Sequence, residues 1–214
     1  MNKDIVDNII KYVEKYFEKD ASGHDFYHTL RVYKIAKQIA EKEKADIVLT
    51  SIIALLHDVD DCKLVGEKGV LFENTRKILK ENDVDSDQID LICSEISKIS
   101  FKGNGVNKPT TLEGKIAQDA DRIDDLGAIG IARTFTYGGS IGRTIYSPEI
   151  PIRDSVSDKD YITNTGTSIG YFYEKKLKTL DLMNTDEARA IANQRTQYIK
   201  DYLKEFFDEW EGNK

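Results

Sequence analysis

Apolar residues recur at three- and four-residue intervals along most of this chain. Two segments near the N-terminus show the pattern most clearly: Ile5, Ile9, Val13 and Phe17 in the first, and Val32, Ile35 and Ile39 in the second. This spacing places the apolar side chains on one face of an α-helix. The sequence therefore begins with two predicted amphipathic helices.

The same period predicts helices further along the chain. Their expected ranges are 47–60, 72–82, 86–99, 111–136, 161–183 and 185–211. Ser86 is a suitable N-cap for the helix over 86–99, and the last helix opens at Thr185 with two acids in its first turn. No segment alternates apolar and polar residues as a half-buried strand does, so the predicted fold class is all-α.

The longest irregular stretch is expected between residues 138 and 166, where several glycines and two of the three prolines gather. Loops of this length are uncommon unless they bind something or are disordered. We expect a lid or a substrate-binding loop, the alternative being an ordinary surface loop. The chain shows no internal repeat or low-complexity tract, so residues 1–214 are predicted to form a single domain.

The formal net charge of -7 makes duplex nucleic acid an unlikely partner for the molecule as a whole, although a local basic pocket remains compatible with a small phosphorylated ligand. Two cysteines are too few for a disulfide framework and suit a reducing compartment. The N-terminal residues show no signal-peptide pattern, and no apolar run is long enough to span a membrane. We therefore expect a cytoplasmic protein.

The histidines point to a metal site. There are only three, His24, His28 and His57, and each lies close to a carboxylate in the sequence. A single histidine is more often an ordinary packed or surface residue, but this concentration beside acids is difficult to explain by chance. His57 and Asp58 also end an apolar segment, where a buried carboxylate needs a partner.

Three predicted helices can bring four ligands together: His28, His57, Asp58 and Asp121. Two nitrogens and two oxygens suit Mn²⁺, Fe²⁺ or Mg²⁺ better than a closed zinc site made of cysteines, and Co²⁺ is a further alternative. Two coordination positions would remain open for water and substrate.

Neighbouring residues suggest catalytic roles. On a continuous helix Asp61 would share a face with His57 and Asp58, so it could accept a proton from water. Arg31 lies three residues after His28 and could reach a phosphate oxygen, and Arg122 could do the same or pair with a nearby acid.

The order His28, His57-Asp58, Asp121 resembles the H…HD…D pattern of the HD-domain metal-dependent phosphohydrolases. The segments 24–32, 57–63 and 118–133, together with 172–175 and 182–185, are similar to a YpgQ-type bacterial branch of that family. The resemblance covers nearly the whole chain. A bare HD dipeptide would be a weak signal, but four ligands in order and the long third segment make a specific one.

This resemblance implies an all-helical HD-domain bundle and hydrolysis of a phosphate ester or anhydride. For this branch it implies Mn²⁺-dependent cleavage of a nucleoside triphosphate to the monophosphate and pyrophosphate. We assign four further residues to substrate binding: His24, Lys63, Arg133 and Arg143. The alternatives are a nucleoside 5'-monophosphate phosphatase and a regulatory HD module that binds a nucleotide without cleaving it. The sequence does not set the oligomeric state, and a homodimer is one option.

Three residues depart from the expected pattern of that branch. Asp60 and Asp125 stand where small or apolar residues are expected, and Tyr171 stands where a histidine is expected. Extra negative charge near a polyphosphate site is costly unless a cation offsets it. The departures therefore bear on substrate preference.

Overall fold

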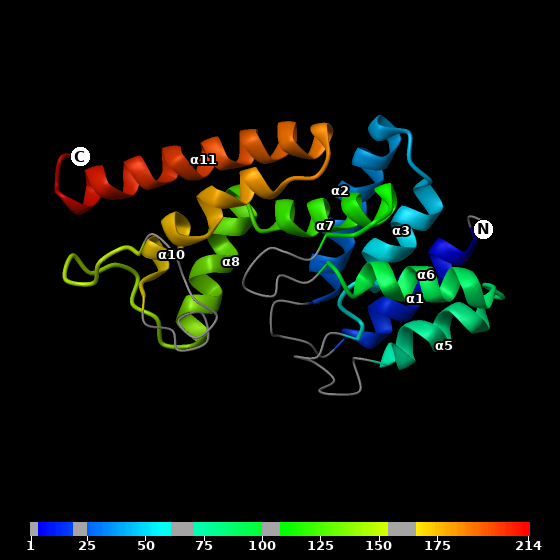
Figure 1. The fold of residues 1–214 in the computed structure, drawn as a ribbon. Helices are drawn as coiled ribbons and strands as arrows, with labels where there is room; N and C mark the ends of the chain where they lie inside the picture. The colour runs from blue at the N-terminus through cyan, green and yellow to red at the C-terminus, as the bar shows by residue number, and fades with distance from the viewer. Residues whose placement is uncertain (1–3, 19–24, 61–70, 100–107, 154–165) are drawn as a thin grey trace. The chain divides into compact units, whose positions relative to one another are not determined.

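The computed structural model describes residues 4–18, 25–60, 71–99, 108–153 and 166–214, and it contains no strand in these ranges. The described elements are α1 Asp4–Tyr16, α2 Phe26–Glu43, α3 Ile47–Leu56, α5 Glu73–Glu81, α6 Ser86–Ile96, α7 Leu112–Asp124, α8 Gly127–Ser140, α10 Ser168–Glu174, the 3-10 helix η2 Lys176–Leu182, and α11 Asp186–Trp210 (Figure 1). The predicted all-α class is confirmed. None of the described helices has both the length and the apolar character needed to cross a bilayer.

The described residues group into two compact units, with the boundary inside α7 between Asp121 and Arg122. The first unit ends at Asp121 and the second begins at Arg122. The prediction that residues 1–214 form one domain stays a prediction.

Helix α3 is the centre of the first unit. Its residues from Thr50 to Leu56 are all buried, and it contacts α1, α2 and α6, while α5 packs against α6. The apolar run Ile52–Leu56 is therefore buried on every side, as its lack of a polar face predicts. This core holds the end of α3 in a fixed place.

Helix α3 is shorter than the predicted range of 47–60. It ends at Leu56, and residues 57–60 form turns. The Val59 amide donates to the Leu56 carbonyl at 3.2 Å, which is a turn contact rather than a continued α-helix. The argument that placed Asp61 on one helical face with His57 and Asp58 therefore fails, because the residues between are not helical.

The start of α5 is capped from a distance by Asp60. The N-cap residue Phe72 has a left-handed backbone (φ 51°) and makes no side-chain cap, but the buried Asp60 carboxylate accepts hydrogen bonds from the amides of Asn74 and Thr75 at 3.2 and 2.8 Å. It also accepts from the Asn74 side chain at 2.9 Å. These donors satisfy two orphan amides of the helix and offset the charge of Asp60.

The cap of α6 is Asp85 rather than the predicted Ser86. The Asp85 carboxylate accepts from the Gln88 amide at 3.0 Å, and Ser86 is the first helical residue. Both residue types cap helices well, so the local sequence left a one-residue ambiguity. The predicted opening of the last helix at Thr185, with Asp186 and Glu187 in its first turn, is confirmed.

The predicted single helix over 111–136 is wrong, because the chain breaks between α7 and α8. Gly127 adopts φ +68°, a left-handed conformation that a side chain would strain. A Cβ at Gly130 would lie 2.2 Å from the carbonyl oxygen of Asp125. The two glycines together permit a break between the helices that the helical pattern on either side concealed.

In the second unit, α11 packs on α8 and η2, and α10 contacts the same two elements. The predicted continuous helix over 161–183 is also wrong within the described residues: residues 166 and 167 precede α10 and are not helical, and a 3-10 helix follows α10 after Lys175. Helix α8 continues to Ser140, so the irregular stretch begins later than the predicted residue 138. Residues 154–165 of that stretch lie outside the described residues.

One buried carboxylate, Glu95 of α6, organises the start of α7. Its Oε2 accepts from the amides of Thr110 and Thr111 at 2.9 and 3.0 Å and from the Thr111 hydroxyl at 2.9 Å. Its Oε1 accepts from the Thr110 hydroxyl at 2.6 Å and from the Lys98 ammonium at 2.8 Å. Burial alone would raise the pKa of Glu95, but these donors outweigh it and lower the pKa to about 2.

We expect Glu95→Gln to remove part of the acid sensitivity of folding. The folded pKa lies below the usual value of 4.5, so the carboxylate stabilises the fold fully above pH 4.5 and progressively less as pH falls toward 2. The variant should be less stable than wild type by about 2 kcal/mol at pH 6, with the difference shrinking below pH 4.5. Urea unfolding at several pH values measures this, and a difference independent of pH would contradict it.

Candidate metal centre

The four predicted ligands converge in the first unit. His28, His57 and Asp58 are buried and offer atoms that lie within 4.8 Å of one another. The Asp58 carboxylate oxygen lies 3.4 Å from His28 Nε2 and 3.2 Å from His57 Nε2. An oxygen of Asp121 lies 3.5 and 3.7 Å from the same two nitrogens.

Each ligand is held by the element that carries it. His28 is in the first turn of α2, where the N-cap Asp25 accepts a hydrogen bond from the His28 amide at 2.7 Å. His57 follows the last residue of the buried helix α3, and Asp58 lies in the turn after it. Asp121 projects from α7 and is the most exposed of the four, at 30%.

The hydrogen bonding of His57 prepares its other nitrogen for a ligand role. His57 Nδ1 lies 2.8 Å from the carbonyl oxygen of Ala54, which can only accept, so Nδ1 carries the proton. Nε2 is buried and has no hydrogen-bond partner, although the Asp58 carboxylate lies nearby. When Nε2 carries no proton, a ring held in this way directs the Nε2 lone pair toward the acids.

The carboxylates make this a strongly negative environment. Burial would lower the pKa of His57, but Asp58 and Asp121 outweigh that effect and raise the pKa to about 10. The cluster thus favours a positive charge at its centre. Either a proton or a metal cation can supply it.

The donors fit a divalent cation. Ligand atoms bound at about 2.0–2.2 Å from one ion lie about 3–4 Å from each other, which matches the four distances between the His and Asp atoms. A buried imidazole nitrogen without a hydrogen-bond partner, facing two carboxylates, is the arrangement that such an ion satisfies. The donor set remains mixed nitrogen and oxygen, as the sequence predicted.

The predicted arginines occupy different surroundings. Arg31 is half-buried on α2, one turn after His28. In the second unit, Arg122 donates to the Leu182 carbonyl, and Arg133 pairs with the buried Asp124 at 2.6 Å. The Arg143 guanidinium lies over the rings of Tyr171 and Tyr137, at 5.1 and 5.8 Å from their centroids. Their proposed roles toward substrate stay predictions.

Three residues predicted for the site, His24, Asp61 and Lys63, lie outside the described residues. Their catalytic or substrate-binding roles therefore also stay predictions.

Sequence inspection missed an ion pair in the second unit between the buried Lys176 and the half-buried Asp125. The Lys176 side chain is only 2% exposed, and its ammonium lies 2.5 Å from the Asp125 carboxylate and 3.0 Å from the Asp125 carbonyl oxygen. The same ammonium lies 5.6 Å from the centre of the Tyr171 ring. Two of the three departures, Asp125 and Tyr171, thus meet at one lysine, which offsets the extra acid. Asp125 and Lys176 are 51 positions apart in the sequence, which explains why no local pattern revealed the pair.

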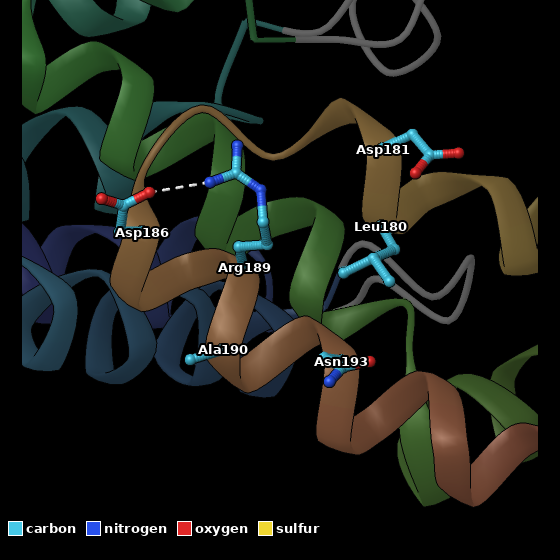
Figure 2. Close-up of a pocket in the computed structure, with 6 residues that line it drawn as sticks. All are labelled: Leu180, Asp181, Asp186, Arg189, Ala190 and Asn193. Atoms are coloured by element: carbon cyan, nitrogen blue, oxygen red, sulfur yellow. Dashed lines mark hydrogen bonds and ion pairs between the residues drawn. The ribbon is translucent and has the colours of Figure 1, made fainter.

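A surface hollow in the second unit contains none of the predicted site residues. Its volume is about 560 Å³, and it is lined by Leu180, Asp181, Asp186, Arg189, Ala190 and Asn193. Figure 2 shows Arg189 turned toward Asp186 on the same helix, an exposed pair with a separation of 2.8 Å. Its charged groups are solvated, so the hollow offers no chemistry comparable to the His and Asp cluster.

Comparison with known proteins places these features in a family. The HD domain model matches residues 25–126, which include all four ligands. The Bacillus subtilis protein YpgQ is 32% identical over 201 residues, covering 93% of this chain and 90% of YpgQ. Its crystal structure in complex with ADP has a TM-score of 0.76 to this fold at 31% identity, covering 97% of this chain and 98% of YpgQ.

Two further crystal structures are similar over almost the full length. A Lactobacillus plantarum protein is 34% identical with a TM-score of 0.82, and the match covers 99% of each chain. An HD-superfamily hydrolase from Bacillus thuringiensis is 38% identical with a TM-score of 0.77, and the match covers 98% of each chain. With the His and Asp cluster in place, the chain belongs to the HD-domain superfamily and is YpgQ-like.

Proposed function

We propose that this protein is a metal-dependent phosphohydrolase that cleaves nucleoside triphosphates to the monophosphate and pyrophosphate. The observation that carries the proposal is the convergence of His28, His57, Asp58 and Asp121 on one point, with the buried Nε2 atom of His57 facing it. Two comparisons support the proposal: the crystal structure of YpgQ with ADP supports a nucleotide ligand, and the HD-superfamily hydrolase from Bacillus thuringiensis supports a hydrolytic reaction.

The proposed reaction is an attack of water on the α-phosphorus. A bond forms between the water oxygen and phosphorus, the bond from phosphorus to the bridging oxygen breaks, and pyrophosphate leaves with that oxygen. When bound, a divalent cation, with Mn²⁺ as the first choice, lowers the pKa of a coordinated water and offsets charge on the phosphate oxygens. Asp61 is proposed to take the proton from the water.

The other residues serve binding and charge compensation in this proposal. Arg31, on the helix that carries His28, is proposed to donate to a phosphate oxygen. Arg122 is proposed to act in catalysis, and His24, Lys63, Arg133 and Arg143 to bind substrate. Three of the proposed metal ligands, His28, His57 and Asp58, are buried, which keeps them in one geometry before a cation binds.

Product analysis by ³¹P NMR tests this function. Metal-free protein with added Mn²⁺ should convert nucleoside triphosphates to monophosphate and pyrophosphate, and in water labelled with ¹⁸O the label should enter the monophosphate. Label in pyrophosphate would mean attack at the β-phosphorus. Orthophosphate from nucleoside monophosphates would indicate the phosphatase instead, and a bound nucleotide recovered intact would indicate a binding module.

A further inference from the structure

The N-terminal part of α7 is joined to α6 by an unusually close contact. Gly114 is buried, and a Cβ at this position would lie 2.2 Å from the Oε2 atom of Glu95 and 2.8 Å from the Cβ of Pro109. Only a residue without a side chain fits there. The backbone of α7 therefore rests directly on the Glu95 carboxylate.

The hydrogen bonds of Glu95 fix the same point. The carboxylate accepts from both the amide and the hydroxyl of Thr111, and the Thr111 hydroxyl in turn accepts from the Gly114 amide at 3.0 Å. A carboxylate at the start of a helix also interacts favourably with the helix dipole. Glu95 thus sets where the first turn of α7 lies on α6.

A second contact repeats this one turn later. The Gln118 side chain donates to the backbone carbonyl of Lys98 at 2.8 Å. The ammonium group of this same lysine pairs with Glu95. Gly114, Gln118 and Asp121 are spaced by four and three residues, so they lie on one face of α7. The face of α7 that contacts Glu95 and Lys98 therefore also carries Asp121.

We propose that Glu95 is a positioning residue for the metal centre, which acts by fixing the placement of α7 and with it the carboxylate of Asp121. The distance along the helix from Gly114 to Asp121 is about 10 Å, so a small shift at the junction moves Asp121 by a similar amount. Metal ligands tolerate displacements of only about 0.5 Å. This inference rests on the proposed function, with Asp121 as a ligand.

Two variants disturb the junction in different ways. In Glu95→Gln, one terminal oxygen becomes an NH₂ group, which must face either the Lys98 ammonium or the amides of Thr110 and Thr111. In Gly114→Ala, a methyl group enters the space that Glu95 Oε2 occupies. Neither variant changes a proposed ligand.

The decisive measurement is the affinity of the metal-free protein for Mn²⁺, by isothermal titration calorimetry, with circular dichroism to establish that each variant is folded. Glu95→Gln and Gly114→Ala are each expected to bind Mn²⁺ about tenfold more weakly than wild type. Asp85→Ala is the matched control, because it removes the cap at the other end of α6 and should lower stability without changing the affinity. Asp121→Ala gives the affinity without the proposed ligand.

The outcomes separate the inference from the function on which it rests. Wild-type affinity in folded Glu95→Gln and Gly114→Ala, with weak binding by Asp121→Ala, would show that the junction does not position the ligand. An equal loss of Mn²⁺ affinity in Asp85→Ala would show that general destabilisation causes the effect, and this result would also overturn the inference. If Asp121→Ala bound Mn²⁺ as wild type does, the proposed ligand set itself would be wrong. Should Glu95→Gln not fold, Gly114→Ala decides the matter.

Discussion

An Asp58→Ala variant should lose nucleotide hydrolysis and bind Mn²⁺ at least about tenfold more weakly than wild type. The Asp58 oxygen lies 3.2–3.4 Å from both histidine Nε2 atoms, so it contributes the charge nearest to the centre of the cluster. Without it, two neutral imidazoles and the partly exposed Asp121 remain. Calorimetry with Mn²⁺ and a pyrophosphate-release assay measure the two effects.

Two companion variants make that result specific. Asp61→Asn should retain Mn²⁺ binding but lose rate, because it removes the proposed proton acceptor and no ligand. Asp90→Ala, which changes an exposed carboxylate paired with Arg76, should behave as wild type in both assays. Hydrolysis by Asp58→Ala at the wild-type rate would place the active site elsewhere.

The Asp125→Ala variant should show the largest loss of stability among the changes considered, about 3 kcal/mol at pH 7. The Lys176 ammonium is almost completely buried, and the substitution removes the carboxylate 2.5 Å away that offsets its charge. Lys175 and Arg133 add repulsion at the same place. Urea unfolding should also show that adding Lys176→Met to Asp125→Ala restores most of the loss, because no uncompensated buried charge then remains.

The pH dependence of this pair has a defined sign. Burial lowers the pKa of Lys176 from 10.5 to about 8, although Asp125 acts in the opposite direction. Between these values the unfolded chain holds a proton that the folded protein has released, so Lys176 makes stability rise with pH from about 8 to 10.5. This increase in stability with pH should be absent when Asp125→Ala and Lys176→Met are combined. Equal stability of Asp125→Ala and wild type at pH 7 would contradict the importance of the pair.

Periodicity and rare residues account for what the sequence revealed. Ile5, Ile9 and Val13 are all buried on one face of α1, as the three- and four-residue spacing predicted. The metal centre was identifiable because histidine is scarce here and all three histidines lie within a few residues of an acid. Their convergence needed only the ordinary packing of α2 and α3.

The features that escaped prediction depend on contacts between distant residues or on a single backbone angle. The break at Gly127 occurs within a helical pattern, and only the left-handed φ angle reveals it. The two threonine partners of Glu95 lie 15 and 16 residues away, and Lys176 lies 51 residues from Asp125. Composition and spacing carry no information on such pairs. The most consequential error was the prediction that α3 continues past Leu56, because that prediction placed Asp61 on one helical face with His57 and Asp58.

The turn over residues 57–60 is anchored at both of its ends. His57 is bound to the Ala54 carbonyl of α3, and Asp60 is bound to the first amides of α5, so Asp58 lies between two fixed points. A cation that binds beside Asp58 therefore has little backbone to order, and its binding loses little conformational entropy. Selection between cations then depends mainly on whether an ion accepts the spacing already present, and a poorly fitting ion cannot be accommodated by rearrangement of the turn.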